Sequence, residues 1–239
     1  MENIKSLIEK KIIKEFCKYT REFSEMDDID YEILIVDNIY DYVYNDDEVY
    51  AQEVLYEHDM LLGLFYVNAE GRLLILLQKA NEVDVFGTLL HEIVHLFDFV
   101  RLADYKGNYN YRKLQDDTFF VLWSEFHADY LSYSYLICNG KSVIAPKEVA
   151  LQIRNKLQEY YSSADKLDLQ TAINKTVRCY GQYAALYINY PNDLNRYLNG
   201  FYFDINFLGV YDYLLEHKTF DKFICDYSQW VTMLKAMEK

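Results

Sequence analysis

The sequence predicts an α+β fold, with a small sheet in the first third of the chain and helices after it. Residues 31–38 and 63–78 are dense in the branched and aromatic apolar residues typical of strands. From about Glu82 to Arg101, and again from Phe119 to Ile137, apolar residues recur with the 3.6-residue period of a helix. The chain from Pro146 onwards is also mostly helical in pattern. Strands followed by a run of helices indicate an α+β arrangement.

A hairpin and two connections complete the prediction. Within residues 63–78, two apolar runs surround Asn68-Ala69-Glu70-Gly71, and an Asn and a Gly bracketing a four-residue turn predict a β-hairpin. Gly63, at the head of the first run, predicts a bulge or a close backbone approach. Residues 48–59 fit a strand or a short helix, and the polar, glycine-containing stretch 102–117 predicts a loop or an irregular connection.

Composition places the chain among globular proteins. At 239 residues, 51% of them hydrophobic, it is long enough for one large domain or for one domain with an appended subdomain. No apolar run reaches the roughly 18–20 residues that span a bilayer, and the charged N-terminal stretch lacks the apolar region of a secretory signal. The cysteines form no cluster, so we interpret them as free thiols in a reducing compartment. We therefore expect a cytoplasmic protein with no membrane contact.

The net charge of −14 is concentrated in one segment. Residues 22–71 contain 15 acidic side chains and no lysine or arginine, while the other 23 acidic residues are balanced by 24 basic ones. Because a nucleic-acid surface needs a basic stripe, we expect no direct binding of nucleic acid. The acidic segment has two interpretations: a solvated surface, or a rim that attracts a basic partner or substrate.

The stretch TLLHEIVHLFDFV, residues 88–100, carries the strongest chemical signal. His91 and His95 are four residues apart, so both imidazoles project from one face of a helix within one turn. Glu92 follows His91 and can converge on the same point. Two imidazoles at this spacing suit Zn²⁺, and the glutamate is placed to act as the general base of a metal-dependent hydrolase.

A chance occurrence of this pattern is the alternative, expected in roughly one chain in a hundred of this length. The rest of the helix argues against chance, because its polar side chains fall on one stripe and its other positions are apolar. The stripe consists of Asp84, Thr88, His91, His95 and Asp98. A helix that is apolar nearly all round is expected to be buried, so its polar stripe must be satisfied internally.

A third ligand is predicted in WSEFHADYLS, residues 123–132. Glu125 lies 30 residues after His95, in an apolar stretch of the next expected helix. Asp129 follows one turn later on the same face, where it can accept the free N–H of a ligating imidazole and fix its tautomer. Zinc in a catalytic site takes three protein ligands and leaves one position open.

Three other histidines are not assigned to the metal. His127 points about 200° away from Glu125 around the helix, so we expect it to have a structural or surface role. His58 and His217 have no local motif and receive no role.

The two motifs together, His91-Glu92-Ile93-Val94-His95 and Glu125-Phe126-His127-Ala128-Asp129, resemble those of the gluzincins, zinc peptidases with HExxH and a downstream ExxxD. The order of a Gly-led hairpin, an HExxH helix and an ExxA-type helix resembles the ImmA/IrrE family of small intracellular metallopeptidases. The resemblance covers about residues 60–137. It implies a zincin-like fold: a small mixed sheet with an edge strand beside the HExxH helix, and a second ligand helix. Residues 1–140 would form this core, with 141–239 as a mainly helical subdomain packed on it.

The resemblance also implies a function, that of a zinc metalloendopeptidase acting on an intracellular protein or peptide. His91, His95 and Glu125 would hold Zn²⁺, Glu92 would be the general base, and Asp129 would support a ligand. LLILLQ, residues 73–78, would be the edge strand, to which an extended peptide could add. Its hairpin partner follows the acidic segment, which motivates the hypothesis of a basic substrate. Family members often act on helix-turn-helix repressors, so the resemblance implies a substrate of that kind.

Two rival interpretations stay open. The chain could be a zincin-fold regulatory or binding protein with a structural or vestigial metal. The presence of Glu92 argues against this rival, because a structural site needs no base and usually has four protein ligands. The other rival treats both motifs as coincidence. An oxyanion donor is also expected, and among the many tyrosines Tyr133 lies within about 80° of the Glu125 face.

Overall fold

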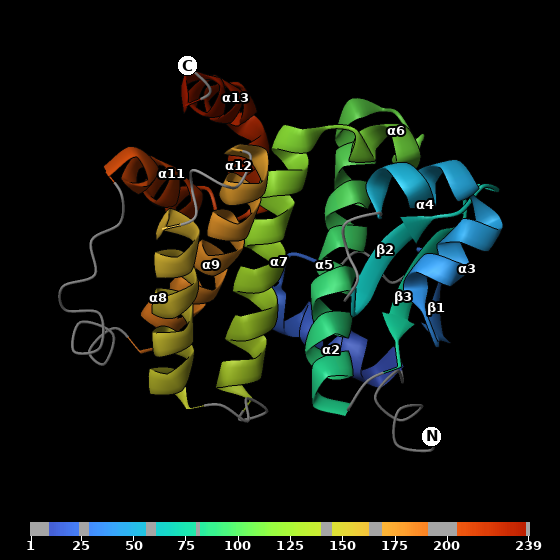
Figure 1. Cartoon of the computed structure of the whole chain (residues 1–239), viewed down its shortest axis with the longest axis horizontal. Coiled ribbons are helices and arrows are strands. Elements are labelled where there is room, and N and C mark those ends of the chain that lie inside the picture. Colours follow the sequence, from blue (N-terminus) through green and yellow to red (C-terminus); the bar gives the residue numbers. More distant parts are fainter. Residues whose placement is uncertain are drawn as a thin grey trace. The chain divides into compact units, whose positions relative to one another are not determined.

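The computed structural model describes residues 10–23, 29–55, 61–79, 82–139, 145–162, 169–190 and 205–237. The chain is mixed α+β, with one small sheet and mostly helical structure elsewhere (Figure 1). The start of the N-terminal helical pattern and His58 lie outside the described residues. The chain divides into two compact units, Met1–Asp116 and Asp117–Lys239. The assignment of 1–140 to a peptidase core and of 141–239 to a subdomain stays a prediction.

The first unit contains three strands and five helices among its described residues. These are α2 (Lys10–Thr20), β1 (Tyr31–Val36), α3 (Ile39–Asp46), α4 (Glu48–Val54), β2 (Gly63–Val67), β3 (Leu73–Gln78), α5 (Glu82–Lys106) and α6 (Tyr111–Gln115). Stretch 48–59, ambiguous in sequence, is helical over α4. The side chain of Asp47 caps that helix by accepting the N–H of Tyr50 at 3.0 Å.

The prediction of a loop over residues 102–117 is wrong in part. Helix α5 continues to Lys106, and Gly107, with φ +59°, follows it. Helix α6 then begins after Asn110, whose side chain accepts the N–H of Lys113 at 3.1 Å. Asn and Gly are frequent in loops, but they are also the residues that begin and end helices, and that is their role here.

The sheet has the order β1-β3-β2 and is small and mixed, which agrees with this part of what the resemblance implies. Strand β1 is parallel to β3, and β2 is antiparallel to β3. The hairpin between β2 and β3 is confirmed. Its turn is closed by the N–H of Gly71, which donates to the Asn68 carbonyl at 2.9 Å, and Gly71 takes φ +81°.

The prediction that residues 73–78 form the edge strand is wrong. These residues are β3, which pairs on both sides, whereas β2 is an edge strand. The physical reason is in the sequence. Leu73 to Leu77 are apolar at every position and all five are buried, as in a strand whose two faces are both covered.

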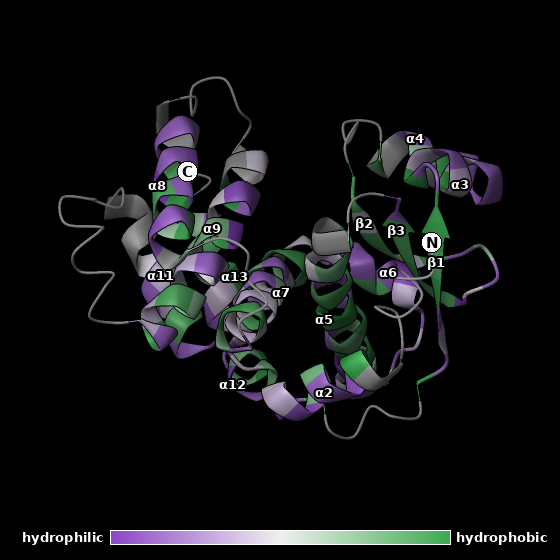
Figure 2. Cartoon of the chain, turned by 90° about the horizontal axis from the view of Figure 1, so that it is seen from below, coloured by the Kyte–Doolittle hydropathy of each residue, from purple (hydrophilic) through white to green (hydrophobic). Residues whose placement is uncertain are grey.

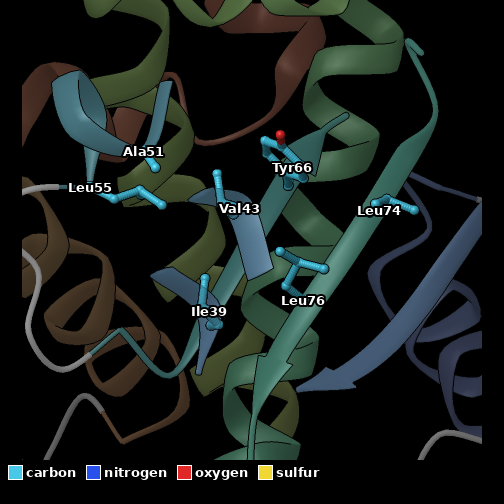
Figure 3. Close-up of a cluster of buried hydrophobic side chains, with 7 residues drawn as sticks. All are labelled: Ile39, Val43, Ala51, Leu55, Tyr66, Leu74 and Leu76. Atoms are coloured by element: carbon cyan, nitrogen blue, oxygen red, sulfur yellow. The ribbon is translucent and has the colours of Figure 1, made fainter. Parts of the chain in front are cut away.

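Helices cover both faces of the sheet, α3 and α4 on one side and α5 on the other (Figure 1). A buried cluster joins the first face to α3 and α4 (Figure 3), and it consists of Ile39, Val43, Ala51, Leu55, Tyr66, Leu74 and Leu76. Neighbouring positions point the other way, because side chains alternate along a strand. The ring of Phe65 lies 5.7 Å from that of Phe99 on α5.

Helix α5 is buried along most of its length, as its apolar pattern predicts. Every described side chain from Leu89 to Val100 is buried, and the ribbon of the helix has the hydrophobic colour over much of its length in Figure 2. These buried residues include His91, His95 and Asp98 of the predicted polar stripe, and Asp98 has no exposed surface.

The second unit is helical throughout its described residues. Its helices are α7 (Thr118–Cys138), α8 (Pro146–Ser162), α9 (Leu169–Asn189), α11 (Ile205–Glu216), α12 (Phe220–Cys225) and α13 (Tyr227–Met237). The side chain of Asp117 caps α7 by accepting the N–H of Phe120 at 3.2 Å, and the helix ends at Asn139 as predicted. The fully buried Trp123 fixes α7 to the C-terminal helices through its Nε1–H, which donates to the His217 carbonyl at 2.9 Å.

Helices α7 and α9 approach each other closely at Gly181. A Cβ on this residue would lie 2.4 Å from the carbonyl oxygen of Phe126 and 2.9 Å from the Cβ of Asp129. Only glycine therefore allows this approach. Within the described part of the chain, none of the helices has the length and apolar character of a membrane span.

Candidate metal centre

His91 and His95 meet at the tips of their rings. Their Nε2 atoms lie 3.0 Å apart, and the rings are close to perpendicular at 80°. Two nitrogen ligands on one tetrahedral zinc are about 3.3 Å apart, because each Zn–N bond is about 2.0–2.1 Å long. The two nitrogens therefore stand nearly where a shared ion requires them. Both side chains are buried, at 8% and 9% exposure.

The structure brings the predicted third ligand to the same group. His91, His95 and Glu125 each offer one ligand atom, and these atoms all lie within 4.8 Å of one another. Among the described residues this is the group of histidine, cysteine and acidic side chains that could hold a metal ion. Two imidazoles and one carboxylate form a donor set that suits zinc and leaves a coordination position open.

Glu92 is held by the neighbouring edge strand. The N–H of Phe65 donates to its Oε2 at 2.8 Å. This contact depends on Gly63, since a Cβ there would lie 2.9 Å from the Cγ of Glu92 and 2.2 Å from the Cγ2 of Thr88. Of the two roles predicted for Gly63, the close backbone approach is confirmed, because the backbone of β2 lies directly against side chains of α5 at this residue. The glycine keeps its place in the regular β2–β3 register.

Asp129 and Glu125 share a cation on α9. The Nε of Arg178 lies 3.3 Å from Oδ2 of Asp129 and 3.4 Å from Oε2 of Glu125. Gly181 follows Arg178 by nearly one turn of α9 and lies against α7 next to Asp129. It therefore sets the distance between α9 and α7 at the point where Arg178 contacts the two carboxylates. The contact predicted from Asp129 to a ligating imidazole stays a prediction.

Two further side chains on α7 have defined surroundings. His127 is fully buried, and its ring stacks on Trp123 at 4.6 Å, so of the two roles expected for it the structural one is confirmed. Burial, and then the charge of Asp129, raise the pKa of Tyr133 to about 12. Its hydroxyl therefore stays protonated at neutral pH and can donate a hydrogen bond.

Two arginines contact the acidic residues of α7 and the edge strand, and no sequence motif marks either of them. Arg178 contacts two acidic residues of α7, and Arg112 of α6 contacts strand β2 and Asp47. Their partners are 45 to 65 residues away in sequence, so no local motif marks them. Gly181 had a weak signal: small residues follow at Ala184 and Ala185, which is typical of closely packed helices.

Comparisons with models of protein families, with curated proteins and with solved structures find no match to this chain.

Proposed function

We propose that this protein is a zinc-dependent metalloendopeptidase of the gluzincin type, acting in the cytoplasm on a protein or peptide. The observation that carries the proposal is the convergence of the His91 and His95 Nε2 atoms at 3.0 Å, with Glu125 in the same group. These three residues would hold Zn²⁺. When bound, the ion would polarise the scissile carbonyl and lower the pKa of water. The resemblance to the ImmA/IrrE family supports the same assignment and suggests a helix-turn-helix repressor as substrate.

Glu92 serves as the general base in this proposal. The Phe65 N–H fixes its Oε2 at 2.8 Å, and its Oε1 would take a proton from the attacking water. The same oxygen then passes the proton to the leaving amine, so water adds across the peptide bond and yields a carboxylic acid and an amine. Asp129 orients a ligand, and the protonated hydroxyl of Tyr133 is a candidate donor to the oxyanion.

A second function is favoured by one specific contact. The hydrogen bond from Phe65 to Glu92 gives this glutamate a structural task, namely joining β2 to α5. The presence of Glu92 is therefore also compatible with a zincin-like regulatory or binding protein whose metal is structural. The two functions differ in what happens when Glu92 loses its basicity but keeps its hydrogen bond.

Glu92→Gln makes that change, because the amide oxygen of glutamine can still accept the Phe65 N–H. We expect the zinc-loaded wild type to cleave unstructured proteins, with new N-termini identified by mass spectrometry. Glu92→Gln should keep one zinc per chain, measured by elemental mass spectrometry. It should lose about 10²–10⁴-fold in kcat, the usual contribution of a general base.

His95→Ala is the matched ligand variant and should lose both zinc and activity. Full zinc occupancy in wild type and Glu92→Gln, with no cleavage by either, would favour the structural metal. A wild type that binds no added zinc would end the metallopeptidase proposal, and the 3.0 Å contact would then be an N–H···N hydrogen bond between the two rings.

A further inference from the structure

Strand β2 is an edge strand of the sheet, and its outer side carries backbone groups near Glu92. The carbonyl of Leu62 accepts from the N–H of Gln78 at 2.9 Å, and the N–H of Asn68 donates to Arg72 at 3.1 Å. In an antiparallel pair such bonded positions alternate, so the backbone groups of Phe65 and Val67 point away from β3. An extended peptide adding to this sheet would pair with them.

Helix α6 already occupies two of these groups, the carbonyls of Phe65 and Val67. The Nε2–H of Gln115 lies 3.4 Å from the Phe65 carbonyl, and the guanidinium of Arg112 donates to the Val67 carbonyl from Nε at 3.1 Å and from Nη2 at 2.8 Å. A primary amide and a guanidinium therefore take the places that the backbone of an added strand would take. The amide oxygen of Gln115 is buried and has no hydrogen-bond partner within the described residues.

Arg112 sits in a pocket that matches a guanidinium. Its Nη1 is paired with Asp47, its Nη2 lies 3.2 Å from the hydroxyl of Tyr66, and its Cζ lies 5.0 and 5.7 Å from the rings of Tyr50 and Tyr66. A carboxylate, a carbonyl, a hydroxyl and two aromatic faces around one planar cation favour arginine over lysine. The Tyr50 N–H, and then Arg112, hold the pKa of Asp47 below its usual value, so this carboxylate is charged at neutral pH.

The acidic segment around Asp47 cannot supply the cation of this pocket from its own residues. Residues 22–71, which include Asp47, contain no lysine or arginine. Any guanidinium in this pocket must therefore be brought by another segment or by another molecule. The pocket also lies two residues along β2 from Phe65, which is about 7 Å in a strand, and Phe65 is bonded to Glu92.

We propose that the pocket of Asp47, Tyr50, Tyr66 and the Val67 carbonyl selects an arginine side chain of the peptide substrate, and that Arg112 and Gln115 of α6 stand in for that substrate when it is absent. The proposal rests on the proposed function, because Glu92 places the reacting bond near Phe65. Substrate binding then requires α6 to leave the edge of β2. The rival explanation is a permanent cover that protects an edge strand from pairing.

The test compares an arginine peptide with its citrulline counterpart, which keeps the planar shape and removes the charge. The zinc-loaded wild type first selects cleavable peptides from an arginine-containing library, and the best is remade with citrulline or lysine. We expect kcat/KM for arginine to exceed that for citrulline by about 10- to 100-fold, the size expected for hydrogen bonds to a charged group. Asp47→Asn should bring the ratio close to one.

Two variants on α6 test whether the substrate displaces this helix from the edge of β2 or whether the helix covers that edge permanently. Arg112→Met removes the internal guanidinium and should raise kcat/KM for the arginine peptide several-fold. Lys113→Met makes the same charge change at an exposed neighbour and should leave the kinetics unchanged. Equal cleavage of arginine and citrulline peptides by a zinc-loaded, active wild type would overturn the proposal and identify α6 as a fixed cover.

A binding measurement keeps the pocket testable without catalysis. Acetyl-arginine methylamide should bind Arg112→Met in calorimetry and fail to bind wild type or the double variant Asp47→Asn/Arg112→Met. Binding with this pattern in a protein that cleaves nothing would overturn the proposed function and leave the arginine pocket standing. Cleavage of peptides with no preference for arginine, together with no binding of acetyl-arginine methylamide to Arg112→Met, would overturn the arginine pocket and leave the proposed function standing.

Discussion

At the scale of single residues, Asp47 serves two parts of the fold with one carboxylate. Its Oδ1 caps α4, and its Oδ2 pairs with Arg112 of α6. The Tyr50 N–H, and then Arg112, lower the pKa of Asp47 from the usual 3.8. A carboxylate whose pKa is lowered on folding stabilises the fold above its unfolded pKa. That stabilisation is lost as the pH falls through the folded value.

Asp47→Asn should therefore destabilise the protein at neutral pH and do so less in acid. Asparagine still caps the helix, so the loss isolates the ion pair, and we expect about 1 kcal/mol for this half-buried contact. Urea unfolding should show a constant difference from wild type between pH 7 and 5 that shrinks below about pH 4. Asp37→Asn, which removes an exposed contact to Lys79 at 3.5 Å, is the control and should have little effect. An equal loss in both variants would contradict the assignment.

The site residues that could be identified from the sequence are those whose partners lie only a few positions away in the chain. His91, Glu92 and His95 occupy one helical turn, and Glu125 and Asp129 another, so their spacing alone predicts a shared task. Arg112 and Arg178 act only through partners that the fold brings to them. A sequence contains no signal for such a pair unless it is already known which strand or helix lies opposite.

At the scale of elements, periodicity predicted α5 and α7, because each carries its apolar pattern over many positions, and the turn residues Asn68 and Gly71 predicted the β2–β3 hairpin. The order of the strands was not predictable in the same way. Resemblance placed β3 at the edge, whereas its continuous apolar run is better satisfied in the centre, with both faces covered. Helix α6 escaped prediction because five residues are too few to show a helical period.

Gly63→Ala tests the approach of β2 to α5. The added methyl group would lie 2.2 Å from Thr88 Cγ2 and 2.9 Å from Glu92 Cγ, so we expect a loss of about 1–3 kcal/mol in the free energy of unfolding, as for other overpacked sites. Thr88→Ala in the same chain should recover part of the loss. Gly209→Ala is the matched control, because a Cβ there meets nothing within 4 Å. In a helix that substitution should be neutral or stabilising. A harmless Gly63→Ala would show that the strand can move away from the helix.

At the scale of the whole molecule, the excess of acid is mainly a property of the surface. Most described acidic residues of segment 22–71 are exposed, among them Glu32, Asp37, Asp41 and Glu48, as a solvated face requires. Asp47 is only partly exposed, and the guanidinium with which it pairs also lies near the rings of Tyr50 and Tyr66. A general attraction for cations would therefore be weak and sensitive to salt, whereas recognition of one arginine depends on the geometry of a single pocket.

The thermal stability of the whole protein provides a test of the metal site that is independent of catalysis. An ion that binds only the folded chain stabilises it by mass action, by about 2.7 kcal/mol at a free concentration of 100 times Kd. In a chain of this length each kcal/mol shifts the melting temperature by about 2–4 °C. Calorimetry should therefore show a rise of roughly 5–11 °C on saturation with zinc, reversed by a chelator. Glu92→Gln should keep this rise and His95→Ala should lose it. A rise that survives in His95→Ala would place the zinc elsewhere on the protein and remove the structural basis of the proposed peptidase.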